Sequence, residues 1–194
     1  MEKTVKRKIL CFESLWDEHV EQRLSVKPFL EVLENLNGFG YTHITCNTQC
    51  ELLFHLHKFI GSKAFKDYKI LYLSFHGYNG KIVLSDQEQL TLEELADILE
   101  QHFKGWRLLL GSCNALCISS KRIMNFLQKT GISFIAGYRK SVDWAEGACF
   151  EFIILDHLLN YSKLKAMRHR IETRYSDFME ANGIVIYHLE RKRK

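Results

Sequence analysis

Two side chains of this sequence, His76 and Cys113, are of the types and in the positions that nucleophilic chemistry requires. His76 follows the apolar run "LYLSF" and precedes Gly77, and Cys113 follows the apolar run "WRLLLGS". A thiol is mostly protonated at neutral pH, and a nearby imidazole supplies the base or ion-pair partner that yields a thiolate. Glycine has no side chain to block a substrate carbonyl, so the N–H groups of Gly77 and Cys113 could stabilise an oxyanion. The pair is a candidate catalytic dyad.

Each of these residues also has a structural interpretation. A histidine after a strand is often a solvated or hydrogen-bonded loop residue, and a cysteine after a strand is often a small buried apolar group. The catalytic interpretation depends on the two side chains meeting, which is a question about the elements that carry them.

Short apolar runs alternate with helical patterns along the chain. We predict strands at 8–13, 41–47, 69–75, 106–112 and 133–138, and helices at 26–37, 50–65, from about 92, at 119–131 and at 145–159. This alternation predicts an α/β fold with a mostly parallel central sheet and helices on both faces. Functional groups of such sheets collect beyond the carboxyl ends of the strands. If the strands before His76 and Cys113 are neighbours, the two side chains lie at one rim.

Other local patterns refine this expectation. Residues 81–86 are typical of a hairpin strand with Gly80 at its turn, and Thr91 with Glu94 forms a capping box that begins the helix near 92. Apolar residues at helical spacing between 164 and 178 predict a basic helix with one buried stripe. The run 183–189 could add an edge strand or fold back over a helix.

Length and composition limit the class of protein. The chain has 194 residues, 46% of them hydrophobic, and a single proline, so we expect one domain over 1–194 with the basic helix and tail 162–194 as an appendage. No apolar run approaches the roughly 20 residues that span a bilayer, and the basic start is unlike a signal peptide. We therefore expect a cytoplasmic protein without a membrane partner. Its six cysteines are scattered, and we expect reduced thiols.

Three runs of the chain together carry a family resemblance: "LYLSFHGYNGKIVLSDQEQLTLEELADIL", "WRLLLGSCNAL" and "FIAGYRKSVDWAEGACFEFIILDHLL". Their order resembles that of the caspase-like (clan CD) cysteine peptidases of the CHAT type, relatives of caspases and separases. The resemblance covers about residues 69–159. It implies a caspase-like three-layer sandwich. The whole chain also resembles a group of small bacterial proteins of uncharacterised function.

The resemblance also implies roles for individual residues. His76 would be the general base or imidazolium partner, Cys113 the nucleophile, and the N–H groups of Gly77 and Cys113 the oxyanion hole. The implied reaction is hydrolysis of peptide bonds in a protein or peptide substrate through a thioester, with no cofactor. Some relatives suggest a role in bacterial stress or antiphage defence, and CHAT domains usually occur beside partner domains, so an activating partner protein is expected. The sequence "GSCNA" differs from the Gln-Ala-Cys signature of caspases, so a preference for Asp does not transfer.

A substrate pocket is expected beyond the fifth strand. Asp143 and Glu146 could receive a substrate Lys or Arg, whereas Asp143-x-x-Glu146 could instead be the capping box of the next helix, which we favour. Trp144 and Tyr138 could form walls of the pocket.

Charged residues near the expected pocket give two further candidates. Arg139 and Lys140 could favour an acidic substrate instead. Asp86, after the hairpin strand, is a weaker pocket candidate, because turns recruit Asp for their own hydrogen bonds.

Three other interpretations compete with a peptidase. Cys46, Cys50, His55 and His57 are spaced unlike zinc-finger ligands, and the two histidines would point about 200° apart on a helix, so we expect no metal. The basic C-terminal helix could associate with nucleic acid, which we consider unlikely. The chain could also be a catalytically idle caspase-fold module that binds a partner through the same rim. Cys117 could form a disulfide with Cys113, but we expect it to pack against the sheet.

Overall fold

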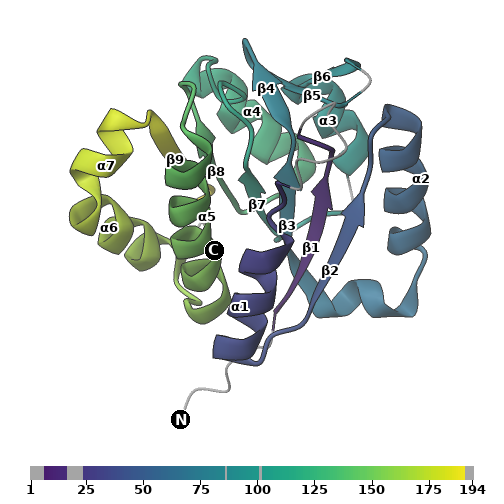
Figure 1. The fold of residues 1–194 in the computed structure, drawn as a ribbon, viewed down its shortest axis with the longest axis horizontal. Coiled ribbons are helices and arrows are strands. Elements are labelled where there is room, and N and C mark those ends of the chain that lie inside the picture. Colours follow the sequence, from purple (N-terminus) through teal and green to yellow (C-terminus); the bar gives the residue numbers. More distant parts are fainter. Residues whose placement is uncertain (1–6, 17–23, 86, 101, 191–194) are drawn as a thin grey trace.

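A six-stranded sheet with the order β2-β1-β3-β7-β8-β9 forms the centre of the computed structural model, which describes residues 7–16, 24–85, 87–100 and 102–190 (Figure 1). Its strands are β1 (Lys8–Glu13), β2 (Tyr41–Thr45), β3 (Tyr68–Ser74), β7 (Arg107–Leu110), β8 (Phe134–Tyr138) and β9 (Ile184–His188). The first five are parallel, and β9 pairs antiparallel with β8. The predicted mostly parallel sheet is confirmed.

Helices cover both faces of this sheet (Figure 1). They are α1 (Lys27–Asn37), α2 (Gln49–Ile60), α3 (Leu92–Leu99), α4 (Ser120–Thr130), α5 (Trp144–Asn160), α6 (Leu164–Arg174) and α7 (Ser176–Ala181). Strand residues alternate between two cores, because successive side chains of a strand point to opposite faces. Leu10 and Phe12 of β1 pack in one core with α2, α3 and α4, whereas Ile9 and Cys11 pack in the other with α1, α5, α6 and α7. The fold is the three-layer α/β sandwich that the sequence predicted.

Helix ends follow the local sequence. The Thr91 hydroxyl accepts the N–H of Glu94, and the Glu94 carboxylate accepts the N–H of Thr91, so the predicted capping box at α3 is confirmed. Gly131 ends α4 in the left-handed conformation, with φ of 69°. The helix predicted over 50–65 is wrong in its last five residues: α2 ends before Gly61, the chain is extended at Ser62, and a separate 3-10 helix follows at Lys63–Asp67.

A small antiparallel sheet stands beyond the carboxyl end of β3. It consists of β4 (His76–Tyr78), β5 (Lys81–Val83) and β6 (Gln89–Thr91). Asn79 and Gly80 form the turn between β4 and β5, both with positive φ, as the two-residue hairpin requires. The strand predicted at 81–86 is therefore shorter, and β6 was not predicted because it has three residues and overlaps the cap of α3.

The C-terminal part completes the central sheet. β9 is the edge strand that was one of the two placements open from the sequence. Met167 and Ile171 are buried in the core that also contains residues of α5 and β9, as the predicted apolar stripe requires. The single helix expected there is divided at Tyr175, whose ψ of 25° at a φ of −125° departs from helical geometry and separates α6 from α7.

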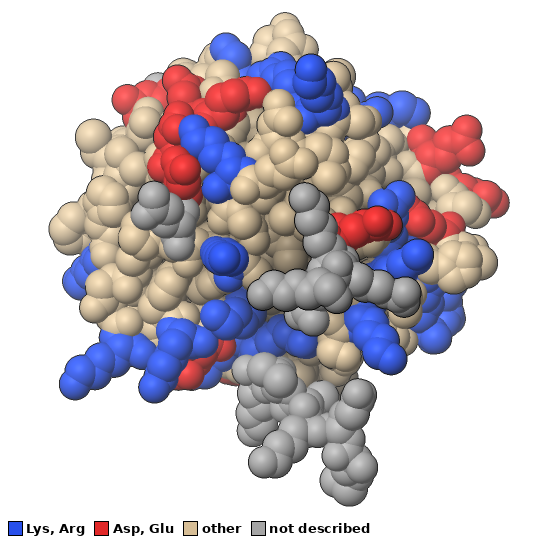
Figure 2. All heavy atoms as spheres, turned by 180° about the vertical axis from the view of Figure 1, so that it is seen from behind, with Lys and Arg blue, Asp and Glu red and all other residues tan. Residues whose placement is uncertain are grey.

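Charged side chains of both signs lie on the face of the molecule drawn in Figure 2. Figure 2 shows the side opposite to that of Figure 1, where Lys and Arg lie in several separate places with Asp and Glu among them. Among the described helices, none has the length and apolar composition needed to cross a bilayer.

Candidate active site

His76 and Cys113 lie at the same edge of the sheet. β3 and β7 are adjacent and parallel, with Leu73 opposite Leu110, so the residues that follow each strand emerge side by side. Both residues line a pocket of about 230 Å³. Its walls come from Trp16, Val26, Phe75, His76, Gly77, Gly111, Cys113, Tyr138, Val142, Asp143, Trp144, Gly147, Ala148 and Glu151. The expectation that the two strands are neighbours is confirmed.

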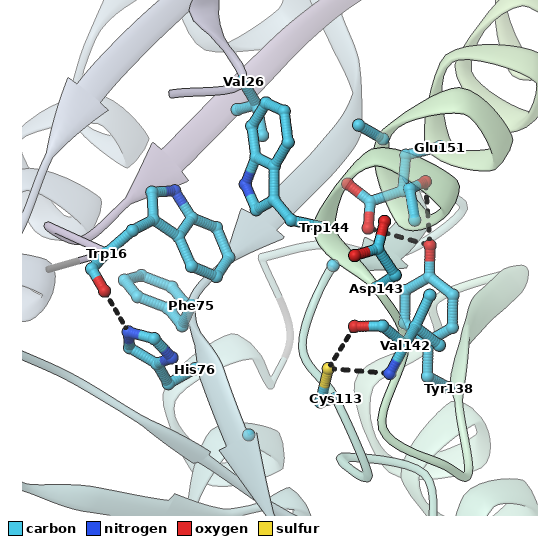
Figure 3. Close-up of a pocket in the computed structure, with 14 residues that line it drawn as sticks. Trp16, Val26, Phe75, His76, Cys113, Tyr138, Val142, Asp143, Trp144 and Glu151 are labelled. Atoms are coloured by element: carbon cyan, nitrogen blue, oxygen red, sulfur yellow. Dashed lines mark hydrogen bonds between the residues drawn. The ribbon is translucent and has the colours of Figure 1, made fainter. Parts of the chain in front are cut away.

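The His76 ring is oriented by the main chain of the segment after β1. Its Nε2 lies 3.0 Å from the carbonyl oxygen of Trp16. A carbonyl oxygen only accepts hydrogen bonds, so Nε2 carries the proton and the neutral ring has a free lone pair at Nδ1. Figure 3 shows Nδ1 on the side of the ring that faces across the pocket toward Cys113. The Trp16 ring also packs edge-on against His76, with centroids 5.1 Å apart.

Glu13, at the buried end of β1, holds this segment in place. Its carboxylate accepts hydrogen bonds from Trp16 Nε1 at 2.6 Å and from the N–H of Val26 at 2.8 Å. It also accepts from Ser25 Oγ and His43 Nε2, both at 2.6 Å. Glu13 therefore positions two walls of the pocket and, through Trp16, the carbonyl that orients His76.

Gly77 packs directly against the main chain of Cys113. A Cβ at position 77 would lie 2.0 Å from the carbonyl oxygen of Cys113 and 3.0 Å from its nitrogen. Next along the hairpin, the N–H of Gly80 donates to the carbonyl of Asn114 at 2.9 Å. The β4–β5 hairpin and the cysteine loop are thus fixed to each other, which explains the glycines around His76.

In the hairpin, the N–H of Gly77 makes no hydrogen bond to the neighbouring strand β5. In a two-residue hairpin the flanking pair, here Tyr78 and Lys81, is the hydrogen-bonded one. The next pair, Gly77 and Ile82, is therefore the non-hydrogen-bonded type, and its N–H groups point away from the partner strand. The Gly77 N–H is directed away from β5.

The Cys113 thiol contacts the loop after β8. Its Sγ accepts the N–H of Val142 at 3.4 Å and lies 3.7 Å from the carbonyl oxygen of Val142. Within the described residues, no hydrogen bond joins Cys113 to His76. Asn114, the next residue, has a φ of 56°, and its N–H donates to the carbonyl of Lys140 at 3.1 Å. The thiol is held on the wall of the pocket opposite His76 (Figure 3).

One face of α5 forms a further wall. Trp144, Gly147, Ala148 and Glu151 recur at helical spacing and all line the pocket. The Glu151 carboxyl accepts the hydroxyl protons of Tyr72 and, at 2.9 Å, of Tyr138. Burial raises the pKa of Glu151 to about 7, although these hydroxyl groups act in the opposite direction.

The other residues expected at the pocket have different positions. Asp143 lines the pocket, but its Oδ1 accepts the N–H groups of Ala145 at 2.9 Å and Glu146 at 3.3 Å, so it caps α5. The favoured capping box is shown only in this half, because among the described hydrogen bonds none joins the Asp143 N–H to the Glu146 carboxylate. Glu146 does not line the pocket. Arg139 bonds to Tyr187 and Lys140 to the carbonyl of Glu180, away from the pocket. Asp86 lies outside the described residues.

The cysteines and histidines considered as zinc ligands, Cys46, Cys50, His55 and His57, do not form a metal-binding cluster. Cys46 is buried and Cys50 is exposed, and no three His, Cys, Asp or Glu side chains form a group able to hold a metal ion in the described parts of the chain. All six cysteines are free. Cys117 is exposed, so the expectation that it packs against the sheet is wrong.

Trp16, Glu13 and Glu151 were not recognised from the sequence. Glu151 had a detectable signal, because it interrupts an otherwise apolar face of the predicted helix. Trp16 and Glu13 gave no comparable signal, since they act on the site through contacts with distant residues.

Comparison with known proteins gives a family and a fold. Residues 6–188 match the model of a family described as "Family of unknown function (DUF6642)". The chain belongs to this family. A search of curated proteins finds no match for this DUF6642 chain. Among solved structures, it is similar to the Drosophila initiator caspase Dronc, with a TM-score of 0.61 and 9% identity over 96% of this chain and 80% of that one. The fold is therefore caspase-like.

Proposed function

We propose that this DUF6642 chain is a cysteine endopeptidase of the CHAT type, with His76 as the base and Cys113 as the nucleophile. The observation that carries the proposal is the hydrogen bond from His76 Nε2 to the Trp16 carbonyl. This bond places the proton of the neutral ring on Nε2, so the lone pair of that ring is at Nδ1, on the side that faces the thiol across the pocket. A caspase-like fold is consistent with this chemistry, although fold alone does not determine activity.

The proposed reaction proceeds through a thioester. His76 Nδ1 takes the proton of the Cys113 thiol, and the thiolate sulfur bonds to the carbonyl carbon of the substrate. The N–H groups of Gly77 and Cys113 stabilise the resulting oxyanion. The C–N bond then breaks, and His76 returns its proton to the leaving amine. Water, deprotonated by His76, attacks the thioester, releasing the carboxylic acid product and restoring the thiol.

The hydrogen bonds of Cys113 favour a second candidate function. In the described structure, Sγ is hydrogen-bonded to the main chain of Val142 and not to His76. A module that uses the caspase fold only to bind a partner would have no need to break these bonds. For a peptidase, we propose that the Cys113 side chain also rotates in the free protein so that the thiol turns toward His76, and that the substrate or an activating partner protein favours this arrangement by displacing the Val142 contact.

Turnover separates the two candidates. Purified wild type, Cys113→Ala and His76→Ala would be compared on a library of unstructured peptides, with products identified by mass spectrometry. Cys117→Ala is the matched control, because Cys117 is an exposed cysteine outside the pocket. We expect cleavage by wild type and by the control, with losses of at least about 10³-fold in the two dyad variants. Equal cleavage by wild type and Cys113→Ala would contradict the proposal.

A further inference from the structure

The part of the pocket formed by α5 is lined by two small residues and one acidic residue. Gly147 and Ala148 are the small residues of the helix face that lines it, and Glu151 follows one turn later. Trp144 lies one turn before them on the same face. A side chain that enters between the small residues therefore meets the Glu151 carboxyl group.

Glu151 is a buried acid whose partners are neutral. Glu151 is only 7% exposed to solvent. Its carboxyl group accepts hydrogen bonds from the hydroxyl groups of Tyr72 and Tyr138. Within the described part of the chain, no Lys, Arg or His forms an ion pair with it. Buried carboxylates in proteins are normally paired with a cation. Burial instead keeps this carboxyl group partly protonated near neutral pH, and a cation that entered from the pocket would favour its charged form.

The loop that follows β7 packs against this carboxyl group through a glycine. Gly111 lies two residues before Cys113, and a Cβ there would be 2.8 Å from Glu151 Oε2 and 3.0 Å from its carboxyl carbon. A side chain at position 111 would therefore collide with the carboxyl group. The carboxyl group thus lies directly against the main chain that leads into the proposed nucleophile.

The remaining walls suit a cation as well. Asp143 adds a second carboxylate, and the charged side chains that line the pocket are acidic apart from His76 in the part of the chain that the structure describes. Trp16 and Trp144 contribute aromatic rings, whose faces attract guanidinium and ammonium groups. Among the described residues of the lining, an acidic side chain would meet two carboxylates and no Lys or Arg.

From this geometry we infer that the pocket binds a basic side chain, Arg or Lys, of the residue before the cleaved bond, with Glu151 as its counter-ion. The inference rests on the proposed function and names the substrate of that same site. A guanidinium group matches a carboxylate in shape and charge, and the pairing compensates a buried acid that the fold leaves without a cation.

The test uses tetrapeptide coumarinyl amides that differ only in the residue before the cleaved bond, namely Arg, citrulline, Leu or Asp. Citrulline is nearly isosteric with Arg and neutral, so the ratio of kcat/KM for Arg over citrulline measures charge recognition alone. Wild type would be compared with Glu151→Gln, which removes the charge at constant size. Glu146→Gln is the matched control, because Glu146 is an exposed carboxylate of the same helix and does not line the pocket.

We expect wild type and Glu146→Gln to favour Arg over citrulline by about tenfold or more, and Glu151→Gln to lose most of that ratio. Should Glu151→Gln fail to fold, the wild-type ratio alone still decides. Cleavage with Leu, citrulline or Asp equal to or better than Arg would overturn the inference while leaving the peptidase proposal intact. Absence of cleavage of all four amides, together with an unreactive Cys113, would overturn both.

Discussion

The α-carbon of Gly77 lies so close to Cys113 that a Cβ added to it would be 2.0 Å from the Cys113 carbonyl oxygen. Real Cβ atoms do not approach a main-chain oxygen so closely. The residue after the candidate base and the candidate nucleophile are therefore packed main chain against main chain. This contact explains why the strand before His76 continues into glycine.

Replacement of Gly77 by Ala tests this contact. We expect Gly77→Ala to push the cysteine loop away from the hairpin and to lower the free energy of unfolding by about 2 to 4 kcal/mol. Gly61→Ala is the control, because its Cβ would be in ordinary contact, 3.6 Å from the nearest atom, and its φ is −71°. Urea denaturation of both variants is the measurement. Equal stability of the two would show that the contact is looser than described.

Asp143 should act on stability through its helix cap. Its Oδ1 accepts two N–H groups at the start of α5, so Asp143→Ala should lower the free energy of unfolding by about 1 kcal/mol, whereas Asp143→Asn should retain most of the cap. Thr91→Ala, which removes the cap of α3 outside the pocket, should cost a similar amount. Thermal unfolding of the three variants checks this. A loss with Asn as large as with Ala would indicate that the charge, not the cap, matters.

Glu151 should make the protein less stable as the pH rises. Its folded pKa is raised by burial from 4.5 to about 7, so the folded state holds a proton that the unfolded state has released between these values. Stability from this group is complete below pH 4.5 and falls as the pH rises toward 7, by up to about 1.4 kcal/mol per pH unit. Glu151→Gln should remove this slope. Parallel unfolding curves of wild type and variant across that range would contradict it.

Glu13 should have the opposite pH dependence. Burial acts to raise its pKa, but hydrogen bonds from His43, Ser25, Trp16 and Val26 outweigh it, and the pKa is lowered from 4.5. Its contribution is therefore present above pH 4.5 and is lost as the pH falls through the folded pKa. The stability difference between wild type and Glu13→Gln should shrink in acid. A difference that stays constant from neutral pH down to pH 3 would contradict this assignment.

The order of elements could be predicted from the sequence because most of them have local signals. Alternating apolar runs gave the sheet, and the caps at Thr91 and Gly131 gave helix ends. The breaks at Gly61 and Tyr175 were missed, because the helical spacing of apolar residues continues across both.

The candidate dyad could be proposed because each member follows a buried strand, and the neighbouring positions of β3 and β7 then bring both to one edge. The residues that orient the dyad and line its pocket could not be predicted from the sequence. The carbonyl of Trp16 lies 60 residues from His76 in sequence, and a main-chain acceptor has no sequence signature. Glu151 is paired with Tyr72, 79 residues away, on another element. Such contacts depend on tertiary packing alone.

The central claim is that His76 activates Cys113, and selective alkylation tests it most directly. Wild type and His76→Ala would be treated with limiting iodoacetamide at neutral pH, and the modified cysteines mapped by mass spectrometry. Cys50, Cys117 and Cys149 are exposed and serve as controls within the same molecule, whereas Cys113 is only half-exposed. We predict that Cys113 reacts first in wild type and loses this advantage in His76→Ala, because only an activated thiolate outpaces more accessible thiols. A Cys113 that reacts more slowly than the three exposed cysteines, with or without His76, would contradict the account.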